Sequence, residues 1–417
     1  MTITIPPLHK VERRLPSGTP VNVDEAIRAQ WDALNLADQV RGKRIALGVG
    51  SRGVAQIAAM ARCLASLIRE SGGDPFVIPA MGSHGGGTPA GQIEVLAGLN
   101  VTGATVGCPV IATMDTRVIS HTDAGLPVYL DRFAAEADGF FIINRVKIHT
   151  DFHDRYESGL MKMLAIGLGN QDGATQIHNS GVQGLRHVLP AMARQIIQHS
   201  NLIAGIATVE DGYHRPVQLE IIPAAAIPTR EPELLEVSRP LVARLPVDDI
   251  DVLVIDLMGK DISGAGMDTN VIGRWRIDGE PEPDALRIKA IVVLDLTEAS
   301  HGNAAGVGLA DFTVQRLLDK IDFPLFTRNI FTSNFLQRGR IPLVYATDQA
   351  AIEAAITNVY RAHLADHTGA RVIRIRSTLD LATLWVSGNI LREIEDSPDV
   401  IAAGPAEPLA FAAGNLV

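Results

Sequence analysis

Residues 144–181 read NRVKIHTDFHDRYESGLMKMLAIGLGNQDGATQIHNSG, and this stretch holds three histidines, His149, His153 and His178. It also holds Lys162, which stands among apolar residues in the sequence Gly-Leu-Met-Lys-Met-Leu. A lysine inside an apolar run must reach water, find a partner or lose its charge. The stretch is therefore a candidate functional segment. A lysine that snorkels from an amphipathic helix, with histidines in a surface loop, is the competing interpretation.

Strands and helices alternate on both sides of this stretch. Residues 54–71 show apolar positions three and four apart, which predicts a helix. Apolar strand candidates occur in both halves, at residues 44–49, 75–80, 138–146, 250–257 and 290–296. This alternation predicts an α/β fold with two α/β domains and mainly parallel sheets. We expect residues 1–245 to form an N-terminal cofactor and catalytic domain, and residues 246–417 to form a C-terminal domain that closes an active-site cleft between them.

Three smaller features complete the predicted organisation. The N-terminal residues contain a possible edge strand, and a helix is expected around residues 232–245. A further helix is expected at residues 310–321. The tail, residues 402–417, is rich in Ala, Gly and Pro, which predicts a loosely held segment.

Composition narrows the class of protein. The 417 residues carry 37 basic and 47 acidic side chains, a formal charge of −10, which argues against a nucleic-acid-binding surface. The sequence contains no run of about 18 apolar residues, which is the length that would predict a membrane span. The N-terminal sequence lacks the apolar core of a signal peptide, and only Cys63 and Cys108 are present, so we expect a cytoplasmic protein without a disulfide framework.

Two glycine-marked turns follow predicted strands. The first contains Ser51 and Arg52, and the second reads Gly-Ser-His-Gly-Gly-Gly-Thr around His84. In open α/β sheets, ligands bind at the carboxyl ends of strands, so both turns are candidate ligand contacts. The Arg52 guanidinium suits a carboxylate or phosphate, and an imidazole such as His84 suits acid–base chemistry. An exposed flexible turn is the alternative in each case.

The histidine pair His149 and His153 permits a different interpretation. Histidines four apart on a helix can bind zinc, as in metallopeptidases. The glutamate of a His-Glu-x-x-His motif is absent, however, and residues 150–151 are typical of a turn. A zinc-type metal-dependent hydrolase and a non-catalytic protein that binds small acids or nucleotides both stay open as alternatives.

The order and spacing of these residues resemble the nickel-dependent lactate racemase family over about residues 40–185. In the resemblance, Arg52 matches an arginine after the first strand, and His84 matches a histidine in a Gly-x-His turn. The remaining three matches are His149 as the second catalytic histidine, Lys162 in a Gly-x-x-Lys context and His178 sixteen residues later. Two features depart from the family pattern: Val49 replaces an acidic residue, and the spacer between His149 and Lys162 is longer.

The resemblance implies a racemase or epimerase that inverts C2 of a 2-hydroxy acid by hydride transfer. It implies a nickel-pincer nucleotide that is covalently bound through Lys162, with His178 as the nickel ligand. His84 and His149 would act as acid and base on opposite faces of the substrate, and Arg52 would bind its carboxylate. Ser51 is a candidate cofactor contact in the same turn.

Further expectations concern the second domain and the partners. Lys260 is a candidate substrate contact, with Arg274 as a second choice. The expected partners are a small 2-hydroxy acid and the cofactor-synthesis enzymes, without nucleic acid or membrane. The sequence does not determine which hydroxy acid or sugar acid is bound, or how many chains assemble.

Overall fold

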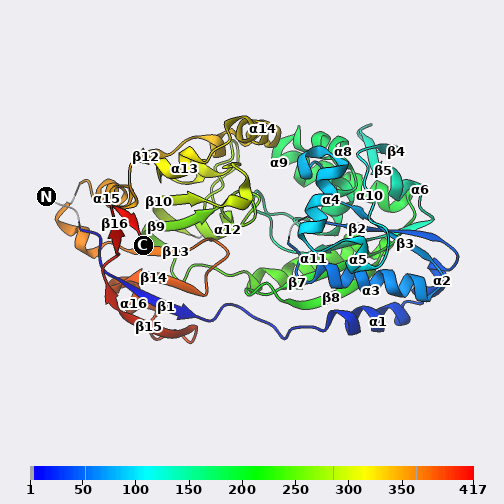
Figure 1. Ribbon diagram of the computed structural model, residues 1–417, viewed down its shortest axis with the longest axis horizontal. Coiled ribbons are helices and arrows are strands. Elements are labelled where there is room, and N and C mark those ends of the chain that lie inside the picture. The colour runs from blue at the N-terminus through cyan, green and yellow to red at the C-terminus, as the bar shows by residue number, and fades with distance from the viewer. Residues whose placement is uncertain (1–3, 52, 285, 363) are drawn as a thin grey trace. The chain divides into compact units, whose positions relative to one another are not determined.

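The computed structural model describes residues 4–417 except residues 52, 285 and 363. The chain divides into two compact units (Figure 1). One unit is Pro16–Val242, and the other joins the residues that precede Pro16 to Ala243–Val417. Both units are α/β with mainly parallel sheets, so the predicted fold class is confirmed.

The Pro16–Val242 unit contains a five-stranded sheet in the order β3-β2-β6-β7-β8. Strands β3, β2, β6 and β7 are parallel, and β8 pairs antiparallel with β7. The strands are β2 (Arg44–Val49), β3 (Asp74–Pro79), β6 (Gly139–Arg145), β7 (Leu202–Glu210) and β8 (Pro216–Pro223), with a separate hairpin of β4 (Thr116–His121) and β5 (Pro127–Asp131). The prolines of β3 predict a strand at the edge of a sheet, and β3 is the edge strand of this sheet.

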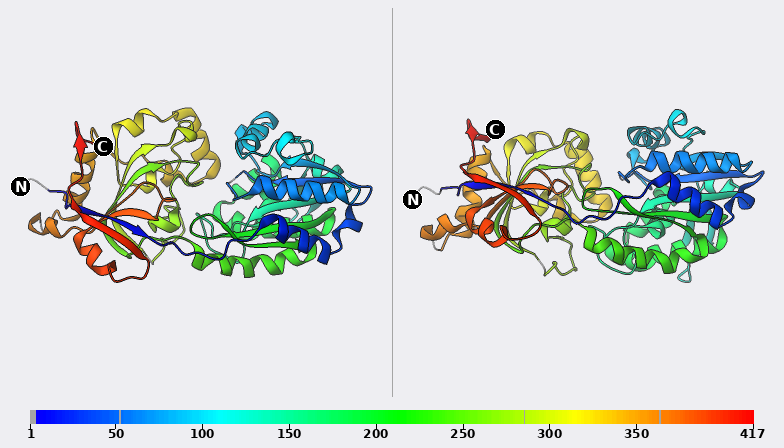
Figure 2. Two further views of the ribbon diagram at one scale, coloured as in Figure 1. Left: turned by 60° about the horizontal axis from the view of Figure 1, so that its bottom comes forward. Right: turned by 90° about the horizontal axis from the view of Figure 1, so that it is seen from below.

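Helices cover both faces of this sheet (Figures 1 and 2). Its longer helices are α1 (Val23–Ala33), α3 (Ile57–Glu70), α4 (Pro89–Gly98), α8 (Asn170–His178), α10 (Leu189–His199) and α11 (Ile227–Ser238). Shorter helices are α2 (Leu36–Val40), α5 (Gly103–Val106), α6 (Arg132–Glu136), α7 (Leu160–Lys162) and α9 (Gly181–Gln183), and a π-helical turn, η2 (Met163–Gly167), continues α7. Helices α1 and α3 share one apolar core with alternate residues of β2 and β6.

The other unit contains an eight-stranded sheet in the order β12-β11-β10-β9-β13-β14-β1-β15. Its first five strands are parallel, and β14, β1 and β15 pair antiparallel. The strands are β1 (Leu8–Arg13), β9 (Asp249–Met258), β10 (Arg287–Leu296), β11 (Phe312–Val314), β12 (Leu343–Tyr345), β13 (Val372–Ile375), β14 (Thr383–Ser387) and β15 (Val400–Glu407), with a small hairpin of β16 (Phe411–Ala412) and β17 (Asn415–Leu416). The helices are α12 (Thr269–Ile272), α13 (Gln315–Asp319), α14 (Phe323–Ser333), α15 (Asp348–Val359) and α16 (Gly388–Ile394).

Four details differ from the sequence prediction. Strand β1 lies inside the eight-stranded sheet between β14 and β15, so it is not an edge strand and does not belong to a unit that spans residues 1–245. The tail is not loose over β15, because this strand pairs with β1. The helix expected at residues 232–245 begins earlier, as α11, and continues through Pro232. Residues 310–321, where a helix is expected, contain the short strand β11 before any helix begins.

Among the residues that the structure describes, no helix is long and apolar enough to cross a membrane.

A substitution of Phe141 tests the packing of the core against the five-stranded sheet. Its ring is fully buried and lies 5.8 Å, centroid to centroid, from the ring of Trp31 on α1. Phe141→Ala should lower the free energy of unfolding by about 3–5 kcal/mol, because it removes apolar contacts and leaves a cavity. Val118→Ala, at a side chain that is 52% exposed, should change it by less than about 0.5 kcal/mol. Equal shifts for the two variants in denaturant titrations would contradict this packing.

Candidate functional site

The predicted site residues of the Pro16–Val242 unit follow neighbouring parallel strands. Ser51 follows β2, His84 follows β3, and His149 follows β6. Parallel strands end on the same edge of a sheet, so these three side chains are presented along one edge. Because the strand order is β3-β2-β6, His84 and His149 come from the strands that flank the Ser51 turn.

Ser51 and His84 are in direct contact. The Ser51 hydroxyl oxygen lies 2.5 Å from Nδ1 of His84. This hydrogen bond orients the ring of His84. Three consecutive glycines, Gly85, Gly86 and Gly87, follow with φ between 65° and 68°, a conformation that favours glycine over every other residue.

His149 and Lys162 form the second contact of the site. Nζ of Lys162 lies 2.5 Å from Nε2 of His149, whose ring belongs to a buried residue. The backbone N–H of Asp151 donates to Nδ1 of the same ring over 3.0 Å. A neutral imidazole whose Nδ1 accepts a hydrogen bond carries its proton on Nε2. Nε2 is the ring atom that faces Lys162.

Residues that neighbour Lys162 connect its contact with His149 to the contact between Ser51 and His84. Met163 follows Lys162, and its Cε lies 2.8 Å from where a Cβ on Gly50 would sit, next to Ser51. The amide of Gly82, in the His84 turn, donates to the carbonyl of Gly167 at the end of η2 over 3.0 Å. The helical segment with Lys162 therefore packs against the turns after β2 and β3.

His178 lies at the end of α8, and its imidazole is neutral at ordinary pH. Burial and then the nearby amine of Lys162 lower the pKa of His178 to about 4, against an opposing effect of the Asp151 carboxylate. A neutral imidazole keeps a lone pair for a transition metal. His178 is thus close enough to Lys162 for the two groups to interact electrostatically.

Two buried carboxylates support the segment, and the sequence alone did not point to them. Glu157 accepts hydrogen bonds from the His149 backbone N–H (2.6 Å) and from Nδ1 of His153 (3.1 Å). Glu231 of α11 accepts from the backbone N–H of Met161 over 2.8 Å, at the start of the helix with Lys162. Burial raises the pKa of Glu231 to about 7, although backbone N–H groups of Met161 and Leu160 oppose the rise.

The other predicted residues lie outside the described residues or in the other unit. Arg52 lies outside the described residues. Lys260 belongs to the other unit, where its Nζ donates to the carbonyl of Gly264 (2.6 Å) and its backbone N–H donates to the Ser300 hydroxyl. Arg274, also in that unit, forms a 2.6 Å ion pair with Asp311, which is typical of a structural arginine.

The chemistry of the donors fits a cofactor that supplies most of its own metal ligands. No cluster of three or more His, Cys, Asp or Glu suitable for a metal ion occurs among the described residues. The rings of His149 and His153, the residues of the alternative zinc site, contact Lys162 and Glu157 respectively. One neutral histidine beside an amine nucleophile, as His178 and Lys162 provide, suits a covalently tethered group with a single protein ligand to its metal.

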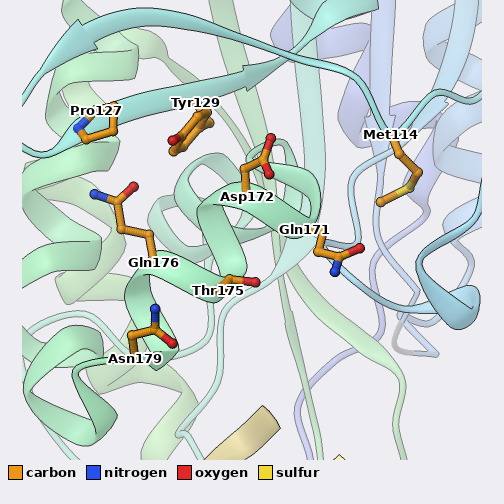
Figure 3. Close-up of a pocket in the computed structure, with 8 residues that line it drawn as sticks. All are labelled: Met114, Pro127, Tyr129, Gln171, Asp172, Thr175, Gln176 and Asn179. Atoms are coloured by element: carbon orange, nitrogen blue, oxygen red, sulfur yellow. The ribbon is translucent and has the colours of Figure 1, made fainter.

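A pocket of about 730 Å³ lies along another part of α8, beside the β4–β5 hairpin (Figure 3). It is lined by Met114, Pro127, Tyr129, Gln171, Asp172, Thr175, Gln176 and Asn179. The lining is uncharged apart from Asp172, whose carboxylate accepts a 2.6 Å hydrogen bond from Thr116. The predicted site residues do not line this pocket, so it is distinct from the Lys162 and His149 contact.

The fold resembles a solved structure over most of its length. The lactate racemase apoprotein from Thermoanaerobacterium thermosaccharolyticum superimposes with a TM-score of 0.54 and 11% sequence identity, covering 89% of this chain and 99% of that chain. The chain therefore shares its fold with this lactate racemase apoprotein. A protein from Thermotoga maritima matches with 12% identity and a TM-score of 0.49, covering 78% of this chain and 83% of its own. No protein-family model and no curated protein sequence matches the chain.

Glu231 should make the stability of the Pro16–Val242 unit depend on pH. The folded state keeps the Glu231 proton up to a pKa of about 7, whereas the unfolded chain loses it near 4.5. The folded state therefore binds more protons between these values, and stability falls as pH rises through that window, by at most about 3 kcal/mol.

Glu231→Gln should remove this loss. From pH 5 to pH 8, its melting temperature should fall less than that of the parent protein. Glu233→Gln, at an exposed position of the same helix, is the matched control and should follow the parent. Parallel falls for all three proteins in calorimetry would argue against a buried, protonated Glu231.

Proposed function

We propose that this protein is a racemase or epimerase that inverts the C2 stereocentre of a 2-hydroxy acid. The observation that carries the proposal is the contact of Lys162 with His149 beside a neutral His178, at the strand edge of a lactate racemase fold. Lys162 would hold a nickel-pincer nucleotide covalently, with His178 as the nickel ligand from the protein. When bound, this cofactor would accept the C2 hydride and return it.

The two catalytic histidines have complementary roles. One imidazole takes the proton of the substrate hydroxyl as the C2 hydrogen leaves as hydride, which produces a planar 2-keto acid. The histidine on the opposite face would give a proton back to the oxygen when the inverted 2-hydroxy acid forms. The strand order supports this assignment, because His84 and His149 flank the turn that contains Ser51.

Other parts of the proposal concern binding. Arg52, next to Ser51, would hold the substrate carboxylate through its planar guanidinium, so that the keto acid is retained while it turns. Ser51 would contact the cofactor as well as orient His84. Lys260 stays a predicted substrate contact, and the cofactor-synthesis enzymes are the proposed partners in maturation.

The test is expression together with nickel-pincer cofactor-synthesis enzymes. Intact mass should show one covalent adduct that is lost in Lys162→Ala, and metal analysis should find about one nickel per chain, lost in His178→Ala. A panel of single-enantiomer 2-hydroxy acids, followed by optical rotation, should identify the substrate. His84→Ala and His149→Ala should each lower kcat by about 10²–10⁴-fold, the usual contribution of acid–base catalysis.

Two results would count against the proposal. If Lys162 is unmodified and no nickel is found under these conditions, the result contradicts the proposed nickel-pincer cofactor. Binding of a hydroxy acid that survives both histidine substitutions, with no turnover in the parent protein, would indicate a non-catalytic binding protein instead.

A further inference from the structure

Glu157 is a buried carboxylate at the centre of the loop that carries His149. Its side chain has no exposed surface, and both of its oxygens accept hydrogen bonds. Oε2 accepts from the His149 backbone N–H and from Nδ1 of His153, whereas Oε1 accepts from Arg239 (2.8 Å) and from the backbone N–H of Asp154 (3.3 Å). Burying a charge this completely is unfavourable unless such partners satisfy it.

The loop around Glu157 is closed at its base. Lys147 and Ser158 exchange two backbone hydrogen bonds, of 2.9 Å and 3.1 Å, so residues 148–157 form a loop between them. Within that loop, the shortest bond to Glu157 comes from the backbone of His149. The carboxylate therefore determines where the His149 backbone lies.

The position of the His149 backbone determines the contact with Lys162. The ring of His149 is oriented by the Asp151 N–H on Nδ1 and by the ring of Phe152, 4.7 Å away between centroids. Both groups belong to the same loop. If the loop shifts, Nε2 moves away from Lys162, since the lysine stands on a separate helical segment that Glu231 anchors.

Arg239 connects this loop to α11. It follows the helix directly and bonds Glu157 through Nη2 and Glu236 through Nε. The hydroxyl of Tyr156 also donates to the carbonyl of Pro228 at the start of α11 over 2.7 Å. The loop is thus held at both ends of one helix.

We propose that Glu157, held by Arg239, is a positioning residue for the site, which fixes the direction of the His149 ring toward Lys162. Only the kinetic part of this inference rests on the proposed function. The orientation of the ring is a property of the apo protein.

The experiment compares Glu157→Gln and Arg239→Gln with the control Glu236→Gln. Glu236 bonds the same arginine but is exposed. Long-range ¹H–¹⁵N spectra of ¹⁵N-histidine apo protein report the ring, with the His149 signal assigned by its loss in His149→Gln. The parent and Glu236→Gln should show one tautomer, protonated on Nε2, whereas the two test variants should show exchange between tautomers.

Kinetics of the cofactor-loaded enzyme provide the second readout. Glu157→Gln should lower kcat by about 10- to 100-fold with KM changed less than about threefold, as expected for a small misplacement of a catalytic group. Arg239→Gln should cause little further loss in the Glu157→Gln background, because both act through one contact.

The outcomes separate this inference from the proposed function. An unchanged His149 tautomer in both test variants, with circular dichroism that shows folded protein, would overturn the positioning role whatever the reaction is. Additive effects of the two substitutions on kcat would also overturn it, because Arg239 would then act elsewhere. If Glu157→Gln fails to fold, Arg239→Gln alone decides by the same spectra. A parent protein that lacks racemase activity but shows the expected tautomer shifts would support the positioning role and contradict only the proposed reaction.

Discussion

The parallel pairing of β2 with β3 on one side and β6 on the other is the constraint on which the site depends. This pairing aligns the ends of three strands, and each end carries one polar turn. Ser51, His84 and His149 are far apart in the sequence but share an edge because of it. An antiparallel β2 would direct its turn to the opposite edge and separate Ser51 from His84.

The sequence predicted this sheet well because its strands are buried on both faces. Such strands read as continuous apolar runs, as β2 and β6 do, and the glycine turns mark their ends. His84 and His149 were predicted as site residues in turns after such strands, whereas Lys162 was predicted from its apolar run and His178 from its spacing to Lys162. The π-helical turn η2 and the exact start of α11 were not predictable, because local propensity does not specify them.

Pairings between distant segments were not predictable from the sequence. Strand β1 joins a sheet whose other strands begin more than 230 residues later, and β15 reads as a loose Ala-rich tail until its partner is known. Glu157 and Glu231 were missed for the same reason. In the sequence, a glutamate in a polar loop or on a helix resembles a surface residue. Only the folded chain shows that Glu157 is buried against Arg239 and that Glu231 is buried against the Met161 backbone.

The two missed carboxylates explain part of the pattern that the sequence did show. The glycine in Gly-x-x-Lys has a physical reason, because a Cβ on Gly159 would lie 2.4 Å from Cδ of Glu231. Glycine at this position therefore lets a carboxylate reach the first N–H groups of the helix that carries Lys162. Glu157 acts in the same way on the other side of the contact, through the backbone of His149. Each partner in the Lys162 and His149 contact is thus positioned by a buried acid that bonds its own main chain or that of the adjacent residue.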